Sequence, residues 1–126
     1  MFYISNLTKT TPPSDFLHYK KISQLVLGKN FELSVSFISP QKSRELNKKF
    51  RNKNKTANVL SFPLEKNSGE ILINLKTKKE AQKFKMSHKK YIDFLLIHGC
   101  LHLLGLDHGE KMDLLEQKFL SKAGYK

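Results

Sequence analysis

The alternation of hydrophobic and polar residues along the chain predicts several short strands. Residues 31–37 place Phe31, Leu33, Val35 and Phe37 at every second position, the period of a half-buried strand. Residues 58–65 and 70–75 predict two more strands, separated by turn-forming residues at 67–69. Residues 2–4 are expected to begin an edge strand, and Pro63 favours an edge or a bulge.

Helical spacing of apolar residues predicts the other elements. We expect helices over residues 15–28, 40–51, 76–104 with a break near 86–88, and 110–122. In the helix expected over residues 40–51, Leu46 and Phe50 lie four residues apart, which places both on its inner face. The fold class is therefore α+β, a small mixed sheet of three to four strands with about five helices. A histidine-bearing helix like that of zinc hydrolases is expected to pack on the sheet.

Length and cysteine content narrow the class of protein. The 126 residues are expected to form one domain, residues 1–126, that buries its own core. Cys100 is the only cysteine, which excludes an internal disulfide and favours a reducing compartment. The first residues lack the pattern of a secretory signal, and the most apolar stretch, residues 94–106, is too short to span a bilayer. We therefore expect a cytoplasmic protein with no membrane partner.

The charge of the chain favours an anionic partner such as nucleic acid. Lys and Arg total 23 against 11 Asp and Glu, a net charge of +12. Residues 42–55 and residues 76–90 each hold seven basic residues and one acidic residue. The alternative is that lysine merely covers solvated faces, since only two of the 23 are Arg.

Three histidines fall within residues 98–108, and they carry the strongest chemical signal. On a helix, His98 and His102 lie about 40° apart around the axis and one turn apart along it. Gly105 offers a helix stop, after which His108 can fold back toward the other two. Three converging imidazoles would hold Zn²⁺ and leave one coordination position open, as in catalytic zinc sites. The alternative is two ordinary helix residues and one loop histidine, but buried histidines need partners and a metal supplies them.

The spacing of this run is that of a zinc peptidase signature, but one residue differs. In those peptidases Glu follows the first histidine and acts as general base, whereas Gly99 occupies that position here. Gly99 suggests close approach by substrate or backbone. Cys100 is about 200° round the helix from His98, which favours a core position over a metal ligand. Asp107 is expected either to orient a ligand imidazole or to cap the final helix.

The chain resembles a known family, the bacterial rRNA-maturation endoribonucleases called YbeY. The family hallmark His-Gly-x-Leu-His-Leu-x-Gly-x-Asp-His is matched at every fixed position by residues 98–108. A second family block, Leu-Asn, then Arg, then Thr-Asp-Val-Leu-Ser-Phe-Pro, is matched by residues 46–63 except that Ala57 and Asn58 replace Thr-Asp. The family's Gly-Asp-Ile appears as Gly-Glu-Ile at residues 69–71. The resemblance covers the chain from about residue 46 onward.

The resemblance implies a single-strand-specific, metal-dependent endoribonuclease that matures the 3′ end of the 16S rRNA precursor and takes part in ribosome quality control. The implied partners are single-stranded RNA, the small ribosomal subunit and assembly proteins. We expect His98, His102 and His108 to bind one Zn²⁺ and Arg51 to contact the scissile phosphate. The lysines expected to bind RNA are Lys48, Lys49, Lys53, Lys55, Lys79, Lys83 and Lys90.

Two other functions are compatible with the sequence. One is a non-enzymatic ribosome-assembly factor with a structural metal. The other is a zinc peptidase, which would need a general base from elsewhere in the chain because Gly99 has no carboxylate.

Overall fold

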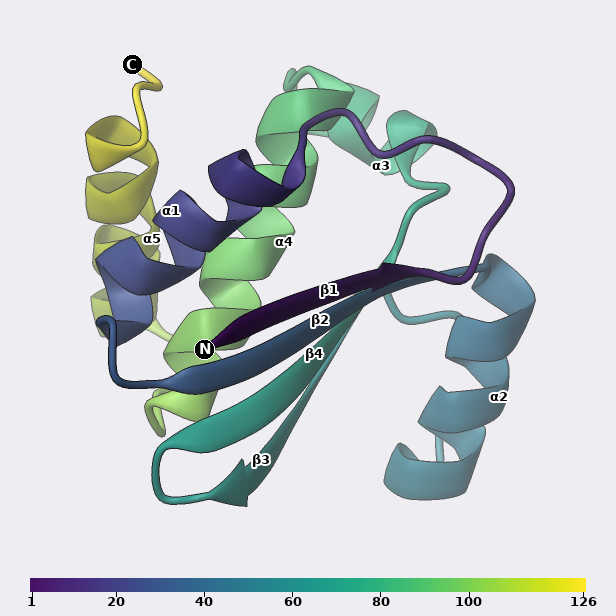
Figure 1. Ribbon diagram of the computed structural model, residues 1–126. Helices are drawn as coiled ribbons and strands as arrows, with labels where there is room; N and C mark the ends of the chain where they lie inside the picture. Colours follow the sequence, from purple (N-terminus) through teal and green to yellow (C-terminus); the bar gives the residue numbers. More distant parts are fainter.

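A computed structural model describes residues 1–126 and contains one four-stranded mixed sheet (Figure 1). The strand order is β1-β2-β4-β3, in which β1 and β4 run parallel to β2 and β3 runs antiparallel to β4. The strands are β1 (Phe2–Asn6), β2 (Glu32–Ile38), β3 (Val59–Glu65) and β4 (Ser68–Asn74). As predicted, β1 is an edge strand and the register of β3 shifts at Pro63, so the proline lies in an edge strand beside an irregularity.

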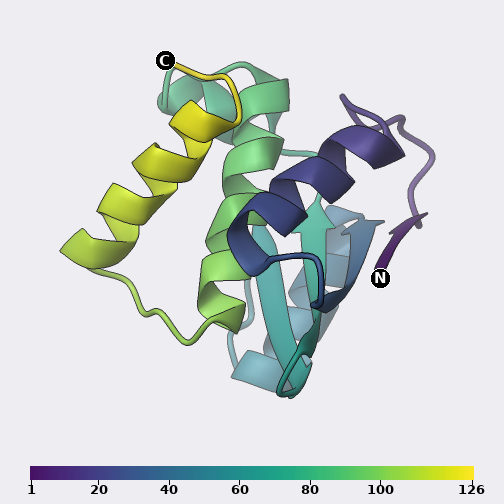
Figure 2. The ribbon, with the colours of Figure 1, turned by 60° about the vertical axis from the view of Figure 1, so that its left-hand side comes forward.

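Helices cover both faces of the sheet. They are α1 (Phe16–Leu27), α2 (Pro40–Arg51), α3 (Lys78–Lys83), α4 (His88–Leu103) and α5 (Glu110–Lys122). Helix α4 lies against β3 and β4, with α1 and α5 packed beside it, whereas α2 lies against the other face (Figures 1 and 2). The predicted α+β class and the packing of the histidine helix on the sheet are both confirmed.

The alternation of strand residues builds a core on each face. Val35, Ile71 and Ile73 join the larger core under α1 and α4. Leu60 and Leu72 point the other way and form a small core under α2 with Ile38. Because α4 is apolar nearly all round, it is buried between the sheet and its two neighbouring helices.

Local signals set the helix ends where they were expected. The Asp15 carboxylate caps α1 by accepting from the amide of His18, and α1 ends at Gly28. The predicted break in the long helical stretch lies between α3 and α4, where Ser87 caps α4. No helix in this fold combines the length and apolarity needed to cross a membrane.

One prediction for α2 was wrong. Phe50 is 57% exposed instead of facing inward, and the buried residues of α2 are Ser43 and Asn47. Both are polar and satisfy the loop that follows the helix: the Ser43 hydroxyl donates to the carbonyl of Ala57, and the Asn47 amide donates to that of Lys55. The inner side of α2 therefore fixes a loop as well as filling a core.

Candidate metal centre

Three imidazoles converge at the carboxyl end of α4. The ring centroids of His98 and His102 lie 4.6 Å apart, and the ring of His108 lies 5.1 Å from the first and 5.0 Å from the second. One nitrogen from each ring can be chosen so that all three lie within 4.8 Å of one another. The convergence expected from the sequence is present, and the cluster is the group of side chains best suited to hold a metal ion.

The way α4 ends brings His108 back to the other two rings. Gly105 adopts the left-handed conformation with φ of 90°. The amide of Gly105 donates to the carbonyl of His102 at 2.9 Å, and the amide of Leu106 donates to that of Leu101 at 3.1 Å. These two bonds form a Schellman motif, which ends the helix and reverses the chain. Leu106 packs against the core and anchors the returning segment.

Each helical imidazole is held by a hydrogen bond from its outer nitrogen. Nδ1 of His102 donates to the carbonyl oxygen of Leu106 at 2.9 Å. Nδ1 of His98 lies 2.5 Å from Oε2 of Glu116, a residue of α5 that is only 5% exposed. Such partners fix the ring orientation of metal-binding histidines and raise their basicity.

These bonds make the inner nitrogens suitable for a cation. A carbonyl can only accept, so Nδ1 of His102 carries the proton, and the Glu116 carboxylate requires the same of His98. The two Nε2 atoms then face each other with lone pairs at 3.1 Å. Tetrahedral zinc with bonds of about 2.0–2.1 Å places its nitrogen ligands about 3.3 Å apart, so this pair of nitrogens fits that ion, and the third imidazole offers a nitrogen within 4.8 Å of both.

Electrostatics favour the neutral, metal-binding form of His102. Burial lowers the pKa of its imidazole below the ordinary value of 6.5, and the neighbouring rings of His98 and His108 lower it further. Asp107 opposes this through its charge, which raises the pKa. Its carboxylate makes no hydrogen bond to an imidazole, and the residue that precedes α5 at the N-cap position is Gly109, so the helix has no side-chain cap. The helix-capping role considered for Asp107 is therefore wrong.

Glu116 is a residue of this centre that the sequence analysis missed. It lies on the buried side of α5 between Met112 and Leu120, four positions from each along the helix. A carboxylate within an otherwise apolar stripe was the available signal, because a buried charge requires a partner. That partner is His98.

Gly99 faces the sheet and not the open side of the cluster. A Cβ atom built on it would lie 3.0 Å from the Ser61 hydroxyl and 3.1 Å from two carbons of Ile71. The Ser61 hydroxyl also donates to the carbonyl of Gly99 at 3.2 Å. Close approach was expected here from substrate or backbone, but it comes from side chains of β3 and β4. At the position that carries the general base in zinc peptidases, a side chain would therefore have to displace Ser61 and Ile71.

The neighbouring Cys100 belongs to the core, as expected. Its side chain is completely buried in the larger core cluster, and burial raises the pKa of the thiol. It is not part of the metal-binding cluster.

The basic residues singled out in the sequence lie in separate places. Arg51, the last residue of α2, is exposed and makes no hydrogen bond or ion pair with the histidines. The neighbouring Phe50 packs on Phe62 of β3, with ring centroids 5.5 Å apart, so only the edge strand β3 separates this end of α2 from α4. Six of the lysines expected to bind RNA are exposed: Lys48, Lys49, Lys53 and Lys55 near the end of α2, and Lys79 and Lys83 on α3. Lys90 is half-buried on α4, with Nζ 5.8 Å from the ring centroid of Tyr125.

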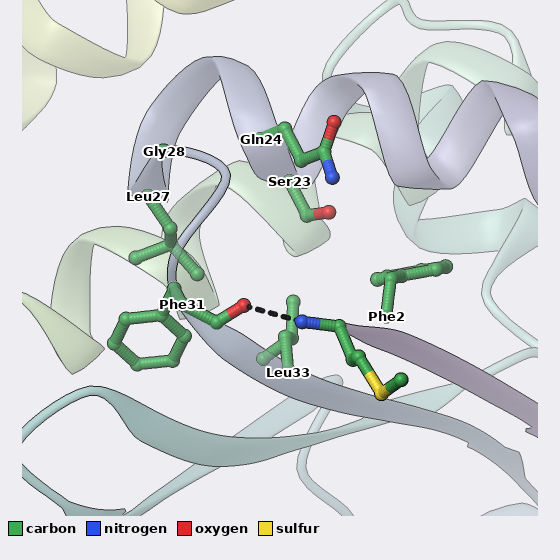
Figure 3. A pocket seen from close by; sticks show the side chains of 8 residues that line it. Phe2, Ser23, Gln24, Leu27, Gly28, Phe31 and Leu33 are labelled. Atoms are coloured by element: carbon green, nitrogen blue, oxygen red, sulfur yellow. Dashed lines mark hydrogen bonds between the residues drawn. The ribbon is translucent and has the colours of Figure 1, made fainter.

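Two hollows in the molecule lie away from the histidines. The first, shown in Figure 3, lies between Phe2, Ser23, Leu27 and Leu33, and its volume of about 10 Å³ suits at most one water molecule. The second is a groove of about 940 Å³ near the amino end of α4, and it includes Lys76, Lys78, Lys79 and His88. Neither is lined by a residue of the cluster.

Comparison with known proteins links the chain to one family. Residues 13–123 match the family model described as Endoribonuclease YbeY. A protein of that name from Thermodesulfovibrio yellowstonii is 40% identical over 119 residues, which cover 81% of this chain and 74% of the relative. Another, from Wigglesworthia glossinidia brevipalpis, is 34% identical over 142 residues, covering 94% and 88%. A solution structure from Thermotoga maritima superposes with a TM-score of 0.68 at 27% identity, covering 98% of this chain and 89% of the other.

Proposed function

The chain belongs to the YbeY endoribonuclease family, as its histidine motif predicted, and from this premise we propose that it cleaves single-stranded RNA with the help of one zinc ion. An endoribonuclease role in rRNA processing follows from the family. The observation that carries the proposal is the convergence of three imidazoles, two of which, those of His98 and His102, already have their outer nitrogens hydrogen-bonded. Three nitrogen ligands with an open position are the donor set typical of catalytic zinc.

The proposed ligands are His98, His102 and His108. Bound zinc would supply Lewis acidity toward a phosphate oxygen and lower the pKa of a water molecule. Glu116 holds the imidazole of His98 and the carbonyl of Leu106 holds that of His102, so neither ring has to reorient during the reaction. His108 is exposed, which leaves its side of the cluster accessible to RNA.

The other roles follow from charge and position. Arg51 is proposed to bind the scissile phosphate, because its guanidinium can donate to two phosphate oxygens and no carboxylate competes for it. The exposed lysines of α2, its following loop and α3 are proposed to bind the RNA backbone. Asp107 is proposed to influence the cluster through its charge alone.

The finer assignment rests on the family resemblance. We propose the 3′ end of the 16S rRNA precursor as substrate, and the small ribosomal subunit with its assembly proteins as the setting, in the cytoplasm. We also propose that residues 1–126 form one endoribonuclease domain.

Metal analysis paired with RNA cleavage tests the proposal. The purified chain is expected to contain close to one zinc ion and to cleave a single-stranded RNA. His102→Ala should lose both properties, whereas Arg51→Ala should lose cleavage and keep the metal. Product end groups then assign the nucleophile, since a 2′,3′-cyclic phosphate indicates the 2′-hydroxyl. Absence of metal together with equal behaviour of all three proteins would reject the proposal.

A second experiment separates catalysis from a purely structural metal. His108 is exposed, so His108→Ala should fold normally. Normal rRNA processing in cells carrying only this variant would support a non-enzymatic assembly factor.

A further inference from the structure

A row of aromatic rings extends along α4 from the metal centre toward its amino end. Phe94 lies 5.9 Å from His98, and Tyr91 lies 6.0 Å from Phe94 with ring planes 23° apart. These residues occur at spacings of three and four, so they share one face of α4 with the cluster histidines. The metal-binding face of the helix therefore continues as an aromatic face.

The row ends in an exposed ring. Phe84 follows α3 and stacks on Tyr91 with centroids 5.9 Å apart and ring planes only 13° apart. Tyr91 is 3% exposed, whereas Phe84 is 62% exposed. Tyr91 therefore lies alongside the Phe84 ring in an offset, nearly parallel arrangement, and most of the Phe84 ring meets solvent. A ring held flat in this way is prepared to accept a second flat group on its free face.

The backbone and a hydrogen bond hold both rings in place. The α3 helix ends in a Schellman motif: the amide of Lys85 donates to Gln82, and that of Met86 donates to Ala81. Lys85 occupies the left-handed position, with φ of 56°, that glycine usually takes. Beneath Phe84, the Tyr91 hydroxyl accepts a hydrogen bond from the Asn58 amide at 3.0 Å. Asn58, where the family pattern has Asp, therefore supports the aromatic row.

The charge around Phe84 identifies the class of ligand. Lys83 and Lys85 flank it directly and residues 81–90 contain no carboxylate, whereas Glu80, one turn before Phe84, is half-buried and its charge acts on Tyr91. An exposed aromatic ring between cations suits a ligand that carries flat bases on an anionic backbone. Single-stranded nucleic acid has both properties, and base–aromatic stacking beside backbone-binding lysines is the common way of binding it.

We propose that Phe84 is a stacking platform for one base of the RNA, and that the strand runs from there past the half-buried Phe94 to the histidine cluster. The inference rests on the proposed function and adds a contact that fixes the substrate several residues from the metal. Tyr91 and Asn58 position the platform without touching the RNA.

The test uses the absence of tryptophan from the chain. Phe84→Trp introduces the only tryptophan of the chain at the platform, which can be excited without its four tyrosines, and its emission should be quenched when a short oligoadenylate is added in chelator, where no cleavage occurs. Phe16→Trp is the matched control, because Phe16 is also exposed, at 44%, and also contacts another ring, that of Phe2 at 5.4 Å. Its emission should not change.

Binding measurements separate stacking from other contacts. Phe84→Ala should weaken oligoadenylate binding by about 5-fold to 100-fold, the range expected for the loss of one base–aromatic stack. Phe84→Leu, which keeps an apolar side chain, should weaken it similarly, and Phe16→Ala should not. An abasic strand of equal length should bind the wild type and the Phe84 variants equally, because only its phosphates make contact. Thermal melting verifies that each variant is folded.

Two outcomes distinguish this inference from the proposed function. If the metal-loaded protein cleaves RNA while Phe84→Ala binds oligoadenylate like the wild type, the platform is wrong and the endoribonuclease stands. If the fluorescence of Phe84→Trp responds to oligoadenylate but the metal-loaded protein cleaves no RNA, the platform is supported and the proposed endoribonuclease activity is wrong. If the Phe84 variants lose as much affinity for the abasic strand as for oligoadenylate, Phe84 acts through folding or through a contact within the protein. That result would also overturn the platform.

Discussion

Nδ1 of His98 lies 2.5 Å from a carboxylate oxygen of Glu116, and this contact joins α4 to α5 beside the histidine cluster. Both residues are shielded from solvent, with side-chain exposures of 16% and 6%. The carboxylate orients the ring and increases the electron density on its inner nitrogen.

Replacement of Glu116 is therefore expected to weaken metal binding. Glu116→Gln keeps an oxygen that accepts the hydrogen bond but removes the charge, and it should lower zinc affinity by about 10-fold to 100-fold. Glu116→Ala should lower it at least as far. A competition titration against a coloured chelator measures the change. Glu110→Gln, an exposed change in the first turn of the same helix, is the control. Equal zinc affinity for Glu116→Gln and the control would contradict the assigned role.

Restoring the peptidase signature should not restore a peptidase. Gly99→Glu would force a charged side chain against Ser61 and Ile71, where even a Cβ atom lies at 3.0–3.1 Å. We expect a loss in the free energy of unfolding on the order of 3–5 kcal/mol, because the charge would be buried without a partner. Urea denaturation measures this loss. Gly99→Ala, which adds no charge, should cost much less because alanine gains helix propensity. A stable Gly99→Glu protein that hydrolyses casein with zinc would refute the interpretation.

The thiol of Cys100 is expected to be unreactive in the native protein. Burial raises its pKa, so little thiolate forms near neutral pH, and the side chain is inaccessible. A chromogenic disulfide reagent should label the chain only after unfolding in guanidinium chloride. Cys100→Ala should retain zinc affinity while losing on the order of 1–2 kcal/mol of stability from the smaller core residue. Zinc-dependent protection of the thiol, together with loss of affinity in the variant, would instead make Cys100 a ligand.

His88 is expected to make the fold less stable in mild acid. Burial lowers the pKa of its imidazole below 6.5, and the nearby charge of Lys78 lowers it further. The unfolded chain therefore binds a proton more readily than the folded chain, and stability declines as the pH falls below about 6.5. In chelator, the free energy of unfolding of His88→Gln should fall less than that of the wild type between about pH 7 and pH 5. Parallel declines for the two proteins would show that His88 contributes nothing.

Local sequence signals predicted much of the fold because caps and periodicity act over a few residues. The limits of α2 and α5 are those expected from Pro40 and from the apolar spacing of residues 110–122. The convergence of the histidines was predictable for the same reason, since helix spacing and Gly105 fix it within residues 98–108.

Contacts between distant segments could not be predicted in this way. Gly99 meets Ser61 and Ile71 only because α4 crosses the sheet at that level. Phe50 turns outward because Ser43 and Asn47 are needed to satisfy the loop carbonyls of Ala57 and Lys55. The pairing of Glu116 with His98 likewise depends on how α5 returns to α4. Each of these depends on tertiary packing, which overrides local pattern.

The three cluster histidines are close together in the sequence, and this affects the order in which parts of the protein fold. Their convergence needs only α4 and the turn after it, whereas the sheet must join residues as distant as Phe2 and Leu33, or Val35 and Ile71. Short loops close faster and with a smaller loss of entropy. We therefore expect the imidazole cluster to assemble in chains whose sheet is still unpaired. Any ion that binds such partly folded chains stabilises the native protein by less than its native affinity implies.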